Sequence, residues 1–152
     1  MTTPSTITVA PVTPAEHEIA IGLTTNAEQT KFVATNHYSL RQAAEQPECK
    51  PMLIRSGGEP VGFAMYAVAP EDNEYWIYRF MIDSRYQRQG LGSRAIGVLT
   101  QHIFDTHSDC ARILLGVVPG NPTAWKLYEQ AGFVDANYQI EGEDVMILDR
   151  RH

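Results

Sequence analysis

One stretch of the chain, residues 80–94, limits the choice of fold more than any other. The apolar residues 80–82 end in a polar turn, and Gly90 and Gly92 then open a helix-period pattern. We interpret the stretch as a strand, a tight loop and a helix N-terminus. The two glycines permit positive φ and a close approach of the backbone to a ligand, with amides pointing into one concavity at the positive end of the helix dipole. A loop of this kind suits a pyrophosphate.

Other phosphate-binding loops have patterns that this stretch does not match. No Gly-Lys-Ser or Gly-Lys-Thr follows the glycines, so the loop is not a Walker loop. A dinucleotide fingerprint needs a third glycine, which is missing. Taken alone, Gly90-x-Gly92 is equally compatible with a purely structural strand-to-helix turn.

The remaining patterns predict a twisted mixed sheet flanked by helices. A parallel pair of strands should enclose the helix that starts at Gly90, through a right-handed crossover. We expect one domain over residues 1–152, of the mixed α/β (α+β) class, with about seven strands and about four helices. The predicted strands are 7–12, 52–55, 60–68, 75–82, 112–118, 133–139 and 145–149, and the predicted helices follow Thr13, run from Ser39 to Ala44, run from Gly90 to Phe104, and follow Asn121.

Composition and charge exclude several classes of function. No apolar run approaches the roughly 18 residues of a membrane span, and the N-terminus lacks the basic and apolar parts of a signal peptide. Cys49 and Cys110 lack the spacing of a zinc site, so we expect no metal, reduced thiols and a cytoplasmic protein. A formal charge of −6 argues against nucleic-acid binding and favours cationic small molecules as ligands. The alternative explanation is that the negative charge only keeps the protein soluble.

Two motifs in order resemble the GNAT (GCN5-related N-acetyltransferase) family. Gln87-x-x-Gly90-x-Gly92 matches the family's loop pattern, and residues 121–133 are similar to its second motif. Residues 32–40 and 75–83 resemble the bacterial spermine/spermidine acetyltransferase branch. The resemblance runs from about residue 28 to the end of the chain and implies the twisted mixed sheet of that family.

The resemblance implies acetyl-CoA as co-substrate. The family holds the pyrophosphate on loop amides and the pantetheine arm against the end of the central strand, in the gap where the fourth and fifth strands part. Asn121 matches a residue that contacts this arm, and a plain helix cap explains it equally well. In this chain the loop and its neighbouring charges are Gln87, Arg88, Gln89, Gly90, Leu91, Gly92, Ser93 and Arg94, and the strand end is Met81 and Ile82.

Acetyl transfer to an amine also needs proton transfers. An alkylammonium of pKa near 10.4 is only about 0.1% neutral near pH 7.4, a cost of roughly 4 kcal/mol unless a base or a water chain removes its proton. Tyr128 matches the family's general acid, which returns a proton to the departing thiolate; packing in the core is the alternative. Glu28, Asp72 and Glu74 are candidate bases, and Glu28 is preferred because its surroundings resemble the polyamine branch.

The acceptor is expected to be a polyamine such as spermidine or spermine, attacked directly in a ternary complex. We expect Glu28 and Glu74 to supply negative charge and Tyr38 and Trp76 to supply cation–π surfaces, together with Tyr75 and Tyr78, unless these aromatics belong to the sheet core. Acetylation of a protein N-terminus, a lysine or an antibiotic amine is the enzymatic alternative. A non-catalytic acyl-CoA sensor is the alternative from another class. The expected partner is a small-molecule amine, with neither nucleic acid nor membrane, and a homodimer is one option.

Overall fold

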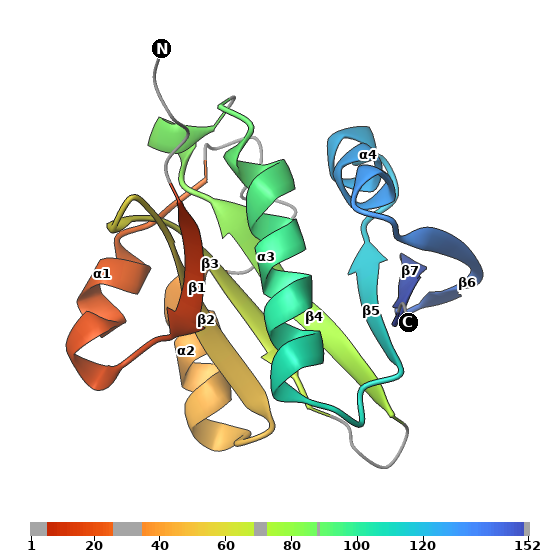
Figure 1. The fold of residues 1–152 in the computed structure, drawn as a ribbon, viewed down its shortest axis with the longest axis horizontal. Helices are drawn as coiled ribbons and strands as arrows, with labels where there is room; N and C mark the ends of the chain where they lie inside the picture. Colours follow the sequence, from red (N-terminus) through yellow and green to blue (C-terminus); the bar gives the residue numbers. More distant parts are fainter. Residues whose placement is uncertain (1–5, 26–34, 69–72, 88, 151–152) are drawn as a thin grey trace.

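The computed structural model describes residues 6–25, 35–68, 73–87 and 89–150. They form a seven-stranded sheet in the order β1-β2-β3-β4-β5-β7-β6, with four α-helices in the described part (Figure 1). The predicted fold class is confirmed. The strands are β1 (Ile7–Pro11), β2 (Cys49–Ser56), β3 (Glu59–Ala67), β4 (Glu74–Ile82), β5 (Arg112–Val117), β6 (Val134–Ile140) and β7 (Glu143–Asp149), and the helices are α1 (His17–Ile21), α2 (Asn36–Glu45), α3 (Leu91–Thr106) and α4 (Pro122–Gln130).

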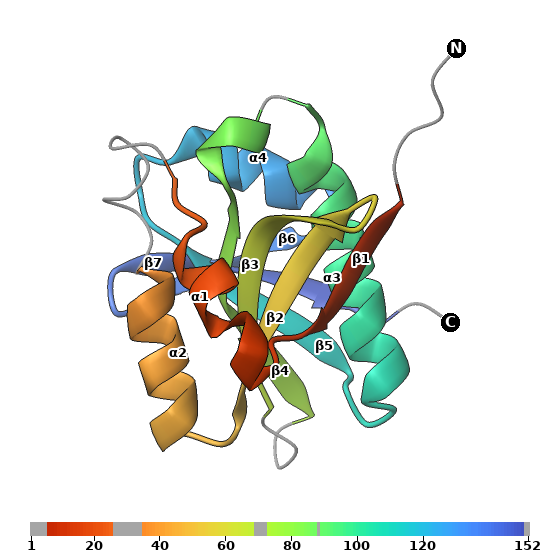
Figure 2. The same ribbon diagram turned by 90° about the vertical axis from the view of Figure 1, so that its left-hand side faces the viewer.

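Helices cover both faces of the sheet. Figure 2 shows α1 and α2 on one face and α3 on the other. The α3 face is filled by a large apolar cluster that includes Leu99 and Phe133, and the face under α1 and α2 by a smaller one that includes Leu53 and Phe63. Because β3 lies between these two layers, it is buried on both faces from Val61 to Ala67. The apolar run around residues 75–82 predicted the same for β4, but β4 is buried only in part, and Tyr78 is 41% exposed.

The pairing of β4 with β5 is the feature that opens the site. All other neighbouring strands are antiparallel, whereas β4 and β5 are parallel and are joined through α3. Their pairing runs only from Glu74 opposite Arg112 to Ile77 opposite Leu115. Beyond that point the two strands diverge, as Figure 1 shows, so the predicted gap between the fourth and fifth strands is present.

Helix α2 begins earlier than predicted. Its N-cap is Thr35 rather than Ser39, because the Thr35 hydroxyl accepts a hydrogen bond from the Tyr38 amide at 3.2 Å. Ser39 lies one turn inside the helix, where its hydroxyl donates to the Thr35 carbonyl at 3.2 Å. The sequence contains both residues, and either is a good cap, so the choice depended on where the chain enters the helix.

Asn36, the first residue of α2, connects the two small helices on this face. Its buried amide donates to the carbonyls of Ala20 (2.7 Å) and Leu23 (3.0 Å), at the end of α1 and just beyond it. This holds α1 and α2 as one unit against the sheet. None of the described helices is long and apolar enough to cross a membrane.

Candidate active site

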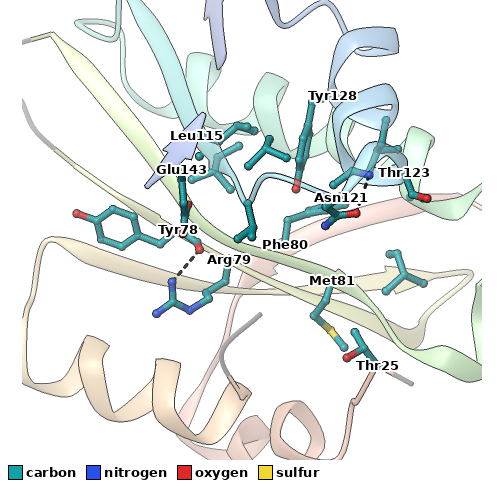
Figure 3. A pocket seen from close by; sticks show the side chains of 18 of the residues that line it. Thr25, Tyr78, Arg79, Phe80, Met81, Leu115, Asn121, Thr123, Tyr128 and Glu143 are labelled. Atoms are coloured by element: carbon teal, nitrogen blue, oxygen red, sulfur yellow. Dashed lines mark hydrogen bonds between the residues drawn. The ribbon is translucent and has the colours of Figure 1, made fainter. Parts of the chain in front are cut away.

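A cleft of about 1500 Å³ opens where β4 and β5 part. Its walls come from the second half of β4, the end of β5, the first turns of α3 and α4, one side of α2 and the β6–β7 turn (Figure 3). Ten of the residues predicted to form the site line this one cleft. They are Trp76, Tyr78, Met81, Ile82, Gln87, Gly90, Leu91, Gly92, Asn121 and Tyr128.

The glycine loop forms the cleft wall at the start of α3. Gly90 is the N-cap in the left-handed region, with φ of 76°, and a Cβ there would meet no atom within 4 Å. The first intrahelical bond, from the Arg94 amide to the Gly90 carbonyl, leaves the amides of the first turn without an intrahelical partner. Donors of this kind at the positive end of a 16-residue helix suit an anion.

The two glycines of the loop differ in their role. Positive φ was predicted for both, but it occurs only at Gly90, because Gly92 already lies inside α3. A Cβ on Gly92 would be 3.7 Å from Leu127 of α4, an ordinary contact distance. The missing side chain at Gly92 therefore leaves space between α3 and α4, while Gly90 makes the turn. Gln87 ties the loop to the end of β4, since its side-chain amide donates to the Ile82 carbonyl at 2.7 Å.

Tyr128 projects into the cleft from α4. In Figure 3 its hydroxyl points into the cleft, on the side where Asn121 and Phe80 lie. The ring lies 6.3 Å from Phe80 and 5.9 Å from Phe133, centroid to centroid, both edge to face. No described residue forms a hydrogen bond with the hydroxyl, and burial raises the pKa of Tyr128 above its ordinary value. The side chain thus packs by its ring and offers a protonated oxygen to the cleft.

Asn121 has the capping role that was foreseen for it, and the contact with the pantetheine arm stays a prediction. Its side-chain oxygen accepts a hydrogen bond from the Ala124 amide at 3.3 Å and caps α4, with Pro122 at the first helical position. The same side chain lines the cleft. The cap fixes the orientation of Asn121, and Tyr128 lies about two turns further along the same helix.

Several predicted residues do not line the cleft. Glu74 lies at the start of β4, where its carboxylate is 4.0 Å from the Arg112 guanidinium. Tyr38 is 60% exposed on α2, and Tyr75 is buried in the core with its hydroxyl donating to Asp109 at 2.7 Å. Gln89, Ser93 and Arg94 also stand outside the lining residues. Glu28, Asp72 and Arg88 fall outside the described residues.

Asp83 is a residue that the sequence analysis missed. It is buried directly after β4, where its carboxylate accepts hydrogen bonds from the Thr24 amide (2.9 Å) and from the Arg85 amide and guanidinium (2.9 and 2.8 Å). Burial alone would raise the pKa of Asp83, but the bonds from Arg85 and Thr24 outweigh it, and the pKa is lowered. Asp83 therefore fixes the chain after α1 against the start of the loop.

Thr25, the residue after Thr24, lines the cleft with a hydroxyl group that lacks a hydrogen-bond partner. Its hydroxyl oxygen is buried and has no hydrogen-bond partner in the part of the chain that the structure describes. Figure 3 draws it beside Met81. A buried hydroxyl without a partner costs about 1–3 kcal/mol, so a bound substrate that offers one is favoured.

The β6–β7 turn supplies charges that the sequence analysis did not assign to the site. Glu141 and Glu143 both line the cleft, on either side of Gly142. Arg79 of β4 lines the opposite wall, where its guanidinium donates to the Ser39 hydroxyl (3.1 Å) and the Gln42 side chain (3.2 Å). Two acidic residues flanking a turn glycine were the available signal. Among the described residues, no group of three or more potential ligands stands close enough to hold a metal ion.

Comparison with known proteins agrees with this geometry. Residues 17–133 match the model of the acetyltransferase (GNAT) family. Over 148 residues the chain is 32% identical to the spermine/spermidine N(1)-acetyltransferase of Bacillus subtilis strain 168, covering 93% of this chain and 97% of that enzyme.

Solved structures show the same fold at lower identity. The aminoglycoside acetyltransferase AAC(6')-Ib in complex with coenzyme A has a TM-score of 0.81 at 18% identity, over 95% of each chain. The spermidine N-acetyltransferase of Vibrio cholerae in complex with CoA and spermine has a TM-score of 0.76 at 16% identity, over 94% of this chain and 95% of that one.

Proposed function

The chain belongs to the acetyltransferase (GNAT) family, and we propose that it transfers an acetyl group from acetyl-CoA to a primary amine of a polyamine, with spermidine or spermine as acceptor. The observation that carries this proposal is the cleft between β4 and β5, which has the Gly90 loop in one wall and the Tyr128 hydroxyl in another. The loop suits an anion and the hydroxyl suits proton transfer, and these are the two needs of a CoA-dependent acyl transfer.

The residues of the cleft fit acetyl-CoA. The Gly90 turn leaves open space where a Cβ would stand, and the first-turn amides of α3 suit the pyrophosphate. Beyond Ile77 the edge of β4 has no pairing with β5. The carbonyls of Tyr78 and Ile82 already accept hydrogen bonds from Arg79 and Gln87, so the peptide groups between them are the proposed partners of the amides of the pantetheine arm. Bound acetyl-CoA supplies the thioester that the amine attacks.

Tyr128 is the proposed general acid. When the amine nitrogen bonds to the acetyl carbon, the carbon–sulfur bond breaks and the thiolate needs a proton. The raised pKa of Tyr128 keeps its hydroxyl protonated at neutral pH, so the proton is present when the thiolate forms. The backbone N–H groups at the end of β4, near Met81, are the proposed donors to the carbonyl oxygen as it gains negative charge.

The proton that the ammonium loses needs an acceptor. Glu28 stays the predicted base, although it lies outside the described residues. A water chain to bulk solvent is the alternative route, and the cleft is open enough to hold one. Attack takes place directly, with amine and acetyl-CoA bound together.

Two observations favour a polyamine acceptor over other amines. The curated relatives at 32% identity are a spermine/spermidine N(1)-acetyltransferase and a probable spermine N(1)-acetyltransferase. The formal charge of −6 also attracts polycations. An aminoglycoside is the second candidate. AAC(6')-Ib superposes with a higher TM-score than the Vibrio cholerae spermidine N-acetyltransferase, and an aminoglycoside also carries several positively charged amines. A sensor without catalysis is disfavoured by the Tyr128 hydroxyl in the cleft.

The experiment is an amine panel with acetyl-CoA and thiol release as the readout. We expect spermidine and spermine to give the highest kcat/KM, followed by diamines and then monoamines, and the differences to narrow with added salt because the attraction is screened. A peptide N-terminus or a monoamine as the best substrate would contradict the polyamine proposal. If none of the amines stimulates thiol release, the transferase proposal itself is contradicted.

Two further features stay predictions. A cytoplasmic location fits the two free thiols, Cys49 and Cys110, both of which are buried. The second is a homodimer. Size-exclusion chromatography with light scattering measures the molar mass and so tests for a dimer.

A further inference from the structure

We propose that Glu143 binds a non-reacting ammonium group of the acceptor at the point where β4 and β5 part, and that Gly116 is the residue that lets it lie there. This inference rests on the proposed transfer to an amine and adds the residue that selects a second positive charge. Glu143 is thus a specificity-determining residue, and Gly116 positions it.

The contact between Glu143 and Gly116 shows how the carboxylate is placed. A Cβ built on Gly116 would overlap the Glu143 side-chain oxygen and would come within 3.1 Å of the Glu143 Cβ. Gly116 does not have positive φ, so the backbone conformation does not require a glycine there. Glycine in a strand interior costs stability and is explained by a close approach. Here the group that approaches is a carboxylate.

The position of this contact along β5 connects it to the reaction. Leu115 is the last residue of β5 that pairs with β4, so Gly116 is the first residue beyond the divergence. On its other side Gly116 pairs with Val145 of β7, two residues after Glu143. The carboxylate therefore lies over the start of the gap in which the thioester is proposed to bind, and it lines the same cleft as Tyr128 (Figure 3).

The carboxylate is available to a ligand. Within residues 6–25, 35–68, 73–87 and 89–150, no basic side chain lies within 4.0 Å of Glu143, and no hydrogen bond to its carboxylate is formed. Among the described residues that line the cleft the cation is Arg79, and its guanidinium donates to Ser39 and Gln42 of α2 and to the Tyr78 carbonyl of its own strand. Negative charge thus stands at the divergence, while the guanidinium is held on the opposite wall.

An ammonium group is the ligand that this arrangement fits. A carboxylate in a cleft accepts two or more N–H bonds from an alkylammonium, and these charge-assisted bonds are stronger than neutral ones. A primary amine that reacts must be neutral, so the carboxylate best serves another nitrogen of the same molecule. Amines with two or more nitrogens gain from this contact, and monoamines do not.

The test compares spermidine with butylamine in Glu143→Gln, in Gly116→Ala and in a control. Gly116→Ala keeps the charge but displaces the carboxylate, so it separates position from charge. Glu129→Gln, on the exposed side of α4 outside the cleft, makes the same change in net charge as Glu143→Gln and is the matched control. kcat/KM is measured for both amines, and calorimetry measures spermidine binding to protein saturated with CoA.

We expect Glu143→Gln and Gly116→Ala to reduce the ratio of kcat/KM for spermidine over butylamine about five- to tenfold and to weaken spermidine binding by a similar factor. CoA affinity and the Glu129→Gln ratio should be unchanged. An equal fall for both amines in Glu143→Gln would overturn the inference, because a base or a structural residue acts on every acceptor. An unchanged ratio would overturn it too, with the transferase proposal intact. If the wild type acetylates no amine, the proposed function fails and this inference fails with it.

Discussion

Replacing Tyr128 by Phe isolates the proton that the account assigns to this residue. The variant keeps the ring, which packs against Phe80 and Phe133 at 6.3 and 5.9 Å, and removes a hydroxyl without a partner among the described residues. The free energy of unfolding should therefore change by no more than about 1 kcal/mol. Loss of a general acid lowers turnover by about 10²- to 10⁴-fold, which is about 2.7–5.4 kcal/mol in the barrier.

The pH dependence of the wild type tests the same assignment. A general acid stops working as the pH rises through its pKa, and the pKa of Tyr128 is raised by burial above the ordinary tyrosine value. Turnover of the wild type should therefore show no fall caused by Tyr128 below about pH 10. On the acid side, turnover should rise with pH as the amine loses its proton.

The assay is single-turnover acetyl transfer to spermidine, so that product release does not mask the chemical step. Tyr138→Phe is the matched control, because Tyr138 is 46% exposed on β6 and does not line the cleft. Calorimetry with CoA should give the same affinity for the wild type and both variants. Full single-turnover rate in Tyr128→Phe would refute the reasoning and leave Tyr128 as a packing residue.

Three other changes test the loop, the anchor and the predicted base. Gly90→Val should reduce CoA affinity more than tenfold. Gly58→Val, with the same kind of positive φ in an exposed hairpin turn, is the control and should strain the backbone without changing CoA affinity. If calorimetry gives the same CoA affinity for Gly90→Val and the wild type, the loop is not part of the site. Asp83→Asn should lower the free energy of unfolding by about 1–3 kcal/mol near pH 7. Because the folded-state pKa of Asp83 is lowered, its contribution to the free energy of unfolding is present above the ordinary pKa near 3.9 and is lost as the pH falls through the folded-state pKa. In urea unfolding near pH 3, the wild type and Asp83→Asn should therefore differ less in the free energy of unfolding than near pH 7. A difference that stays constant with pH would contradict this. Glu74→Gln should leave kcat/KM within about twofold, because its carboxylate faces Arg112 at the paired end of β4, and a large drop would identify Glu74 as the base.

Local patterns were sufficient to predict the parts of the fold that one element determines. The β5–α4 boundary was foreseen because Asn121 and Pro122 form a cap and first turn that need no tertiary contact. The loop at Gly90 was foreseen for the same reason, since a change from strand to helix period is visible in the sequence. Positive φ at Gly92 was a wrong prediction, because two glycines one residue apart do not show which of them makes the turn.

Tertiary contacts determined what the sequence did not reveal. Asp83 looked like an ordinary turn residue, and its burial depends on Thr24 approaching from α1, 59 positions earlier. Glu143 was not assigned to the site from the sequence, and its place in the cleft depends on the absence of a side chain at Gly116 in another strand. Glu74 was placed near the acceptor because it begins the central strand, but only the other end of β4 diverges from β5.

The most direct test of the account is a competition between two acceptors in one reaction. Equal concentrations of spermidine and kanamycin are incubated with limiting acetyl-CoA, and the products are identified by mass spectrometry. We expect acetylated spermidine as the main product in the wild type, and much less acetylated product after the same reaction time in Gly90→Val. Acetylated kanamycin as the main product, or the absence of any acetylated amine while the protein binds CoA, would contradict it.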